Sequence, residues 1–383
     1  MMPSFDFQPT TRVVFGENAL ERLGELTRSL PAKRVLLVTD PGIIRAGHVT
    51  RALGSLEAAG VEAQVFHDVV ENPTTRHVEA GREFAQDLGG IDGIIGLGGG
   101  SAMDCAKGIN FLLTNGGRME DYWGSGKAAK PMLPSIGVPT TAGTGSEGQS
   151  YALISQEETH RKMACGDIKA RFRIVILDPL LPQSVPDEVA AVTGIDAISH
   201  ALESFVSTRR NTVSQMFARE AWHLLEANFE TILEERQNTT AWGQMLLGAH
   251  LAGLAIENAM LGAAHACANP LTANYGVTHG VAVGLMLPHV IRFNSAAVGG
   301  LYAELVRAAG LNDTEGESDV DMLIYRVNRL KAAARLPERL QTLNIPRADL
   351  PRLAREAAEQ WTGRFNPREV SVGELLGIYE EAY

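Results

Sequence analysis

The chain has 383 residues, of which 45% are hydrophobic and 21% are charged, and it carries a formal net charge of −11. This negative balance argues against nucleic acid and anionic membrane surfaces as the main partners, because both repel an acidic protein. A chain of this length exceeds one ordinary hydrophobic core, so two domains are expected. The composition is typical of a soluble α/β enzyme.

The cysteines and the chain start bear on the compartment. Cys105, Cys165 and Cys267 are too few and too scattered for a disulfide framework or a thiolate metal site, which indicates a reducing cytoplasm. The opening Met-Met-Pro-Ser-Phe-Asp lacks the basic and apolar segments of a signal peptide. Glycine, histidine and glutamate interrupt the longest apolar runs, so no transmembrane span is expected.

The first half of the chain alternates short apolar strands with helices. An extended stretch at 5–15 ends in a Phe-Gly turn, and residues 151–155 and 174–177 are predicted to form a hairpin-like excursion. Other strands are predicted at 34–40, 62–66, 93–97 and 134–139, and helices at 17–30, 49–59, 77–88 and 102–112. Such alternation predicts a doubly wound, mainly parallel sheet.

Helical periodicity dominates from residue 186 to the end. The change of character places a domain boundary between residues 182 and 186. We therefore predict an α/β domain over 1–184 and an all-helical domain over 185–383.

A glycine loop between a predicted strand and helix is a candidate phosphate site. It consists of Gly98, Gly99, Gly100 and Ser101. Glycines let the backbone approach a pyrophosphate, whose charge then faces helix N-terminal N–H groups. The spacing departs from G-x-G-x-x-G, so a glycine turn that serves packing alone remains an alternative.

Asp40 follows an apolar strand, at the sheet edge where doubly wound folds bind ligands. A carboxylate there can accept from a ribose 2′-OH and repels a 2′-phosphate, which favours NAD over NADP. Stabilising the turn at Pro41-Gly42 is the alternative role. Asp104 and Lys107, spaced i, i+3 on the helix after the loop, can be a simple ion pair. Hydroxyls for a ribose or phosphate, or for a polar turn, come from Thr140, Thr141, Thr144 and Ser146.

Histidines in an apolar setting indicate a metal site. His265 and His279 lie among small and apolar residues, and a buried imidazole needs a partner. For a lone histidine a backbone carbonyl would suffice. Asp196 and His200, however, are spaced i, i+4, which places a carboxylate and an imidazole on one helix face. One carboxylate and three imidazoles suit a divalent transition metal.

Four motifs in this order resemble the iron-containing (group III) alcohol dehydrogenases. They are Gly98-Gly-Gly-Ser-x-x-Asp104-x-x-Lys107, Pro139-Thr-Thr-Ala-Gly-Thr-Gly-Ser-Glu147, Gly194-x-Asp196-Ala-x-x-His200-Ala-x-Glu203, and His279-Gly280 with Leu287-Pro288-His289. The resemblance runs from Phe15-Gly16 to at least Asn294, and the last stretch of the chain contributes little to it.

The resemblance implies a dehydroquinate synthase-like architecture: an N-terminal dinucleotide-binding α/β domain, an all-α C-terminal domain, and an active site in the cleft between them. It implies Fe(II), in some members Zn(II), held by Asp196, His200, His265 and His279. It implies NAD contacts at Asp40, Asn72, Gly98, Gly99, Gly100, Ser101, Asp104, Thr140, Thr141, Thr144 and Lys162. The implied reaction is hydride transfer between NAD(H) and a primary alcohol or aldehyde, with the metal as Lewis acid. We expect a homodimer or larger homo-oligomer.

Two departures from the family pattern bear on the proton path and the substrate. Asn269, which cannot titrate, stands where many relatives carry a histidine that helps in proton transfer, and Gly148-Gln149 follows Ser-Glu where Val-Thr is common. Alternative readings are a glycerol-type polyol dehydrogenase, which normally lacks the Asp-x-x-x-His pair, and a dehydroquinate-synthase-like lyase. The lyase would need a Lys and Arg cluster that the sequence does not place near these histidines.

Overall fold

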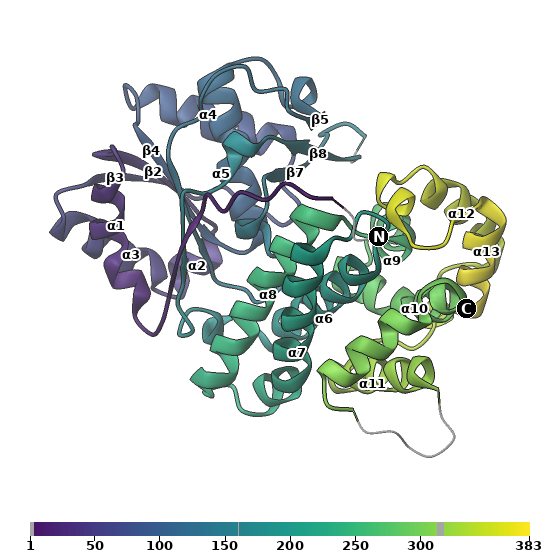
Figure 1. The fold of residues 1–383 in the computed structure, drawn as a ribbon. Helices are drawn as coiled ribbons and strands as arrows, with labels where there is room; N and C mark the ends of the chain where they lie inside the picture. The colour runs from purple at the N-terminus through teal and green to yellow at the C-terminus, as the bar shows by residue number, and fades with distance from the viewer. Residues whose placement is uncertain (1–3, 160, 312–317) are drawn as a thin grey trace. The chain divides into compact units, whose positions relative to one another are not determined.

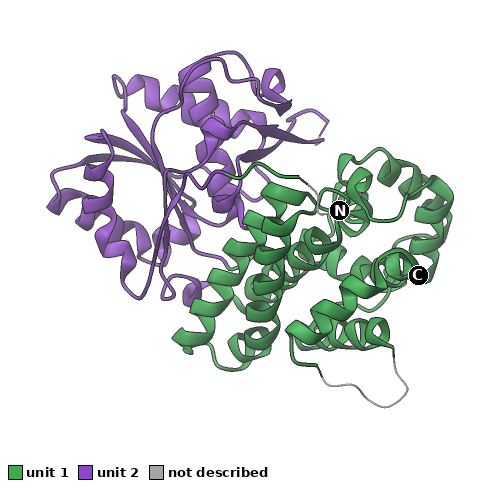
Figure 2. Cartoon of the chain, in the orientation of Figure 1, with its two compact units in different colours: residues 1–7, 142–144, 186–383 green, residues 8–141, 145–185 purple. Residues whose placement is uncertain are grey.

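The computed structural model describes residues 4–159, 161–311 and 318–383. The chain forms two compact units (Figure 2). The α/β unit comprises Gln8–Thr141 and Gly145–Val185, and the helical unit comprises Met1–Phe7, Ala142–Thr144 and Pro186–Tyr383.

The α/β unit is built on a six-stranded sheet with the order β1-β9-β6-β4-β2-β3, in which every neighbouring pair is parallel. The strands are β1 (Arg12–Phe15), β2 (Arg34–Val38), β3 (Glu62–Phe66), β4 (Gly93–Gly98), β6 (Ser135–Pro139) and β9 (Ile174–Leu177). The α-helices are α1 (Leu23–Ser29), α2 (Pro41–Arg45), α3 (His48–Ala58), α4 (Thr75–Asp87) and α5 (Gly100–Asn115). The parallel sheet predicted from the alternating pattern is confirmed.

Helices cover both faces of this sheet (Figure 1). Val35 and Leu37 of β2 pack in one apolar cluster with residues of α1, α2 and α3, while Leu36 and Val38 pack in a second with residues of α4 and α5. Strands buried on both faces have no polar alternation, which is why they read as continuous apolar runs.

The strand order reverses at β2. β3 follows β2 along the chain and pairs with one of its edges, whereas β4 pairs with the other edge. Doubly wound sheets bind ligands beside such a reversal, at the carboxyl ends of the strands. The ends of β2 and β4 are therefore where a ligand site is expected in this unit.

One predicted pairing is wrong. The hairpin partner of β7 (Tyr151–Ser155) is β8 (Lys162–Gly166), and these two form a small sheet with β5 (Gly124–Ser125). β9 instead joins the main sheet between β1 and β6. Its Ile-Val-Ile-Leu run is buried throughout, as a strand inside a parallel sheet requires, whereas the mixed Lys-Met-Ala-Cys-Gly run of β8 gives little strand signal.

The helical unit contains α6 (Asp187–Val206), α7 (Thr212–Glu234), α8 (Thr239–Ala259), α9 (Ala263–Tyr275), α10 (His279–Ala308), α11 (Asp319–Ala333), α12 (Leu350–Ala358) and α13 (Val372–Glu381). Helix α6 packs against α7, α8 and α10, and α9 packs against α10 and α12. This confirms the helical character predicted for the second half.

Two of these helices are long and apolar enough for a membrane span, namely α6 and α10. Their most apolar windows are 83% and 61% buried inside the protein. Helices α8 and α9 would pass the same test together, but they meet at a bend of 105°. The interior of the helical unit accounts for the apolar character of α6 and α10.

Candidate metal and nucleotide sites

Helix α6 supplies a carboxylate and an imidazole from successive turns. The spacing of Asp196 and His200 puts Asp196 Oδ1 3.4 Å from His200 Nε2. Both side chains are buried, at 5% exposure for each residue. The helical i, i+4 pairing predicted from the sequence is present.

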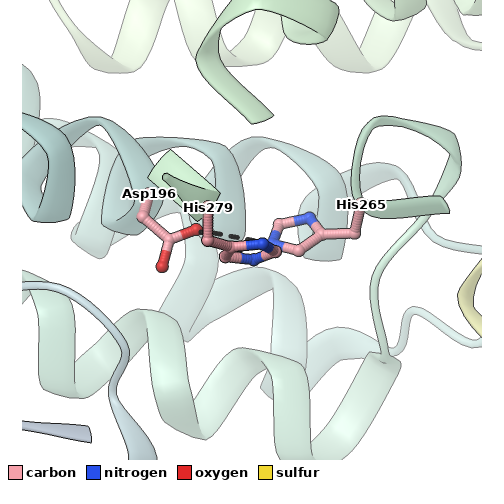
Figure 3. Close-up of side chains that lie close together, drawn as sticks. All are labelled: Asp196, His265 and His279. Carbon is pink, nitrogen blue, oxygen red and sulfur yellow. Dashed lines mark ion pairs between the residues drawn. The ribbon is translucent and has the colours of Figure 1, made fainter. Parts of the chain in front are cut away.

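The other two histidines come from the first turns of two different helices. His265 lies in the first turn of α9 and His279 opens α10, and their Nε2 atoms lie 3.5 and 3.8 Å from Asp196 Oδ1. Asp196, His265 and His279 converge in Figure 3, with ligand atoms all within 4.8 Å of one another. His200 lies outside this group of three, in contact with Asp196 and with its ring stacked on His265 at 4.9 Å.

A close helix approach brings His279 to the group. A Cβ on Gly280 would lie 2.1 Å from the carbonyl oxygen of Val192 on α6. Only glycine fits there, because side-chain carbons do not approach a carbonyl so closely. Gly280 thereby lets the start of α10 rest directly on α6, one residue from His279.

The donor atoms fit a divalent cation. Ligand bonds of about 2.1 Å in a tetrahedron place neighbouring ligand atoms about 3.4 Å apart, close to the 3.5 and 3.8 Å from Asp196 Oδ1 to the Nε2 atoms of His265 and His279. Asp196 Oδ1 and His265 Nε2 are buried and have no hydrogen-bond partner in the described structure. Burying two polar atoms side by side without hydrogen-bond partners costs free energy unless a cation lies between them.

Proton affinities reflect this crowding. Burial opposes ionisation of Asp196, but the surrounding histidines, His200 first, hold the pKa of that carboxyl well below its usual range. Burial lowers the pKa of His200. His265 is also buried, yet the Glu203 carboxylate and Asp196 raise its pKa to about 9.

Glu203 is a functional residue to which sequence reasoning assigned no role, although it stood in the quoted motif. Its carboxylate is 4% exposed and accepts from His265 Nδ1 and, at 2.7 Å, from the backbone N–H of Ala264. A proton held on Nδ1 leaves Nε2 as the free ligand atom. The available signal was its i, i+3 spacing from His200 in an apolar helix.

Asn269 lies one turn after His265 in α9 but outside the ligand group. Its Nδ2 donates to Gln360 Oε1 at 3.0 Å, and both residues are partly exposed. The amide pair provides hydrogen-bonding groups near His265 and no titratable group.

The α/β unit brings several predicted nucleotide contacts to one edge. Asp40, Gly98, Gly99, Thr140 and Thr141 all lie at or just after the ends of β2, β4 and β6. A Cβ on Gly98 would lie 3.4 Å from Asp40 Oδ2, and one on Gly99 would lie 3.5 Å from Thr141. Gly98 has a φ of 152°, which favours glycine, and its carbonyl accepts from Thr140 N–H at 2.9 Å.

Asp40 caps a helix that the sequence pattern missed. Its Oδ1 accepts from the N–H groups of Gly42 and Ile43 at 2.7 and 3.2 Å, and Pro41 opens α2. This is the turn-stabilising alternative considered for Asp40. The cap uses Asp40 Oδ1, whereas Asp40 Oδ2 lies on the side of Gly98. Asp40 Oδ2 is therefore the oxygen that could accept from a ribose hydroxyl.

The remaining predicted contacts are more scattered. Gly100 and Ser101 open α5, Asn72 sits in a loop with a φ of 53°, and Lys162 starts β8 as an exposed residue. Thr144 belongs to the helical unit, unlike the other predicted nucleotide contacts.

The structure gives Lys107 a role beyond its i, i+3 spacing from Asp104. Burial raises the pKa of Asp104 to about 6 against the opposing effect of Lys107. The Lys107 ammonium donates to the carbonyls of Ser146, Gln149 and Tyr151 at 2.6–2.8 Å. Lys107 therefore fixes the chain that follows the threonine-rich loop.

Comparison with known proteins identifies the family. A model described as iron-containing alcohol dehydrogenase matches residues 9–179, and the C-terminal model of the Fe-containing alcohol dehydrogenase family matches 190–383. The chain belongs to the iron-containing alcohol dehydrogenases. Like the family, it is an NAD-dependent, iron-type oxidoreductase that transfers a hydride between NAD(H) and an alcohol or aldehyde.

Relatives of this iron-containing dehydrogenase match along nearly their whole length. The chain is 34% identical to 1,3-propanediol dehydrogenase of Citrobacter freundii over 99% of both chains. It is 30% identical to lactaldehyde reductase of Escherichia coli (strain K12), over 96% of this chain and 97% of that one. A crystal structure of 1,3-propanediol oxidoreductase superposes with a TM-score of 0.96 at 33% identity and covers both chains fully. These matches support the dehydrogenase prediction and not the lyase or polyol alternatives.

Proposed function

We propose that Asp196, His200, His265 and His279 hold one Fe(II) ion in this dehydrogenase, and that its substrate is a short alcohol or aldehyde with a second polar group. The observation that carries the metal assignment is the convergence of three imidazole Nε2 atoms within 3.4–3.8 Å of the unpartnered Asp196 Oδ1. Nitrogen and carboxylate donors suit Fe(II) and Zn(II).

When bound, the metal supplies Lewis-acid polarisation of the substrate oxygen, and NAD(H) supplies or accepts the hydride. The chain's own residues prepare this chemistry. Glu203 keeps the His265 proton on Nδ1, so that Nε2 stays available to the ion. The side chain of His279 is 25% exposed, whereas those of Asp196 and His265 are at most 8% exposed, so the substrate side of the site is the His279 side.

Metal analysis of purified variants tests the ligand assignment. We expect His265→Ala and His279→Ala to lose bound metal and turnover together, because each removes one ligand from a small set. His289→Asn is the matched control, since His289 lies in α10 beyond the ligand group and its Nδ1 faces Glu381 at 3.9 Å. Full metal retention in both alanine variants would contradict the assignment of His265 and His279 as metal ligands.

The polar-substrate proposal has two supports. The relatives named above are a propanediol dehydrogenase and a lactaldehyde reductase. The Asn269–Gln360 amide pair offers hydrogen bonds one turn from His265. A hydroxyl-bearing substrate can hydrogen-bond to such groups, whereas an alkyl chain cannot.

A matched substrate pair decides the matter. We expect kcat/KM for lactaldehyde to exceed that for propanal, which lacks only the hydroxyl. Gln360→Leu is expected to lower the ratio of kcat/KM for lactaldehyde to kcat/KM for propanal. Propanal reduced as efficiently as lactaldehyde would contradict the proposal.

Asn269 also bears on the proton path. The amide cannot titrate, so the transferred proton travels by water, a hydroxyl side chain or the ribose rather than through this position. Asn269→His is expected to change the pH dependence of turnover while leaving metal content unchanged. An unaltered pH profile would count against any proton role for position 269.

We further infer that the edge formed by Asp40, the loop 98–101, Thr140 and Thr141 binds NAD, together with Asn72, Asp104, Thr144 and Lys162. The exposed side of the Asp40 carboxylate selects NAD by repelling a 2′-phosphate. Asp40→Ser is expected to raise the kcat/KM ratio of NADP over NAD, and an unchanged ratio would leave Asp40 with its helix-capping role alone.

The homo-oligomer and the cytoplasmic location are also proposals. Among the described strands β1 pairs with β9 alone, and its Val13 and Phe15 share one strand face at 42% and 49% exposure. An open, apolar edge strand suits pairing with a second copy. Light scattering is expected to show a dimer or a larger oligomer for the protein and a smaller species for Phe15→Lys.

Cell fractionation tests the cytoplasmic location, which the three free cysteines support.

A further inference from the structure

The first turn of α9, which carries His265, is held by side chains from outside the helix. Gly262 precedes α9 and has no side chain to cap it, so the first N–H groups need acceptors from elsewhere. Glu203 Oε1 accepts from Ala264 N–H at 2.7 Å, and Asn366 Oδ1 accepts from Ala263 N–H at 3.2 Å. Asn366 lies 103 residues further along the chain, in the segment between α12 and α13.

The Asn366 amide is fixed in one orientation. Its Oδ1 accepts from Ala263 N–H and from Asn294 Nδ2, and its Nδ2 donates at 2.7 Å both to Asn294 Oδ1 and to the Arg368 carbonyl. These four bonds use both protons and both lone pairs of the amide. A flipped amide would point its NH₂ at the Ala263 N–H, so the backbone itself selects the orientation.

Burial makes this arrangement rigid. Asn366 is 4% exposed and Asn294 is 1% exposed. A buried amide that lost one of these partners would leave the other polar atoms unsatisfied, which is costly. The carboxylate of Glu203 and the amide of Asn366 therefore hydrogen-bond to two adjacent residues, Ala264 and Ala263, in the first turn of α9.

We propose that Asn366, oriented by Asn294, is a positioning residue for the metal site: it fixes the first turn of α9 so that His265 Nε2 faces Asp196. In the described structure the hydrogen bonds of Asn366 reach no predicted ligand, so Asn366 acts through the backbone of Ala263. The segment between α12 and α13, which lies outside the four motifs, thus supports one wall of the site. The inference rests on the proposed metal site.

Binding of Co(II) to the metal-free full-length protein tests it, with affinity measured by chelator competition and geometry by the visible absorption spectrum. We expect Asn366→Leu to weaken Co(II) binding by about tenfold or more and to change the spectrum. Asn110→Leu is the matched control, because Asn110 is 2% exposed and its amide hydrogen-bonds the backbone of Leu133, in the α/β unit. That variant should lower stability and leave affinity and spectrum unchanged.

Two further variants distinguish failure of the Asn366 proposal from failure of the metal site. If Asn366→Leu does not fold, Asn294→Ala takes its place; it removes the group that orients Asn366 and should weaken Co(II) binding in the same direction. Wild-type affinity and spectrum in whichever of these two variants folds would overturn the role of Asn366. Unchanged Co(II) binding by His265→Ala would instead overturn the metal site itself.

Discussion

Replacing Gly280 by alanine tests whether the contact between α10 and α6 builds the metal site. The new Cβ would lie 2.1 Å from the Val192 carbonyl oxygen and 2.8 Å from its carbon, both backbone atoms that no rotamer change can move. Relief requires the start of α10 to move away from α6 by roughly 1 Å, since non-bonded carbon and oxygen rarely approach within about 3 Å.

A displacement of that size is large on the scale of coordination. Metal–ligand bonds tolerate about 0.2 Å, and His279 is the residue next to Gly280. Its Nε2 is already the most distant of the three imidazole atoms, at 3.8 Å from Asp196 Oδ1. We expect Gly280→Ala to lose bound metal and to lower turnover on the order of 100-fold, with about 1–3 kcal/mol of lost stability from overpacking.

Gly300 provides the matched control on the same helix. A Cβ there would meet nothing within 4 Å, so Gly300→Ala should keep metal and activity and raise stability by about 0.5–1 kcal/mol. Metal content, steady-state kinetics and urea unfolding of both variants form the assay. Gly280→Ala protein with wild-type metal content and turnover would refute the reasoning.

Three further predictions concern buried charges. Burial first, and then nearby cations such as Lys331, lower the pKa of His289 to about 4. The unfolded chain binds this proton more tightly, so stability should fall by about 3 kcal/mol as pH drops from 6.5 to 4. His289→Asn should reduce the pH dependence of the free energy of unfolding, measured with urea, over that range. Asp104 has a pKa raised to about 6, so the folded state holds its proton more tightly and stability of the cofactor-free protein should fall by about 2 kcal/mol as pH rises from 4 to 6; a pH dependence unchanged by Asp104→Asn would assign the effect to another group. Lys107→Met removes a buried ammonium that donates to three carbonyls, so calorimetry should show a loss of about 1–3 kcal/mol, and a variant as stable as the parent would show that the loop re-forms without the lysine.

The sequence by itself determined the family and most strands and helices of the main sheet and the helical unit. Apolar runs such as Val35–Val38 predict buried strands, and the motifs around Asp196 and His279 predict the chemistry, because both signals lie in contiguous residues. The i, i+4 spacing of Asp196 and His200 even fixes their shared helix face. Asp40 shows the limit of such reasoning: the residue type suits a ribose contact and a helix cap alike, and only the structure revealed the cap.

Tertiary structure alone decided which distant segments meet. The apolar run of β9 suits an inner strand, but the run does not say which strands lie beside it, because pairing depends on which strand edges are left open. Glu203 and Asn366 gained their roles because the bend after α8 brings the start of α9 against both. Local periodicity reports which face of an element is apolar; it does not report the partner on that face, because helix contacts are set by close packing among residues far apart along the chain.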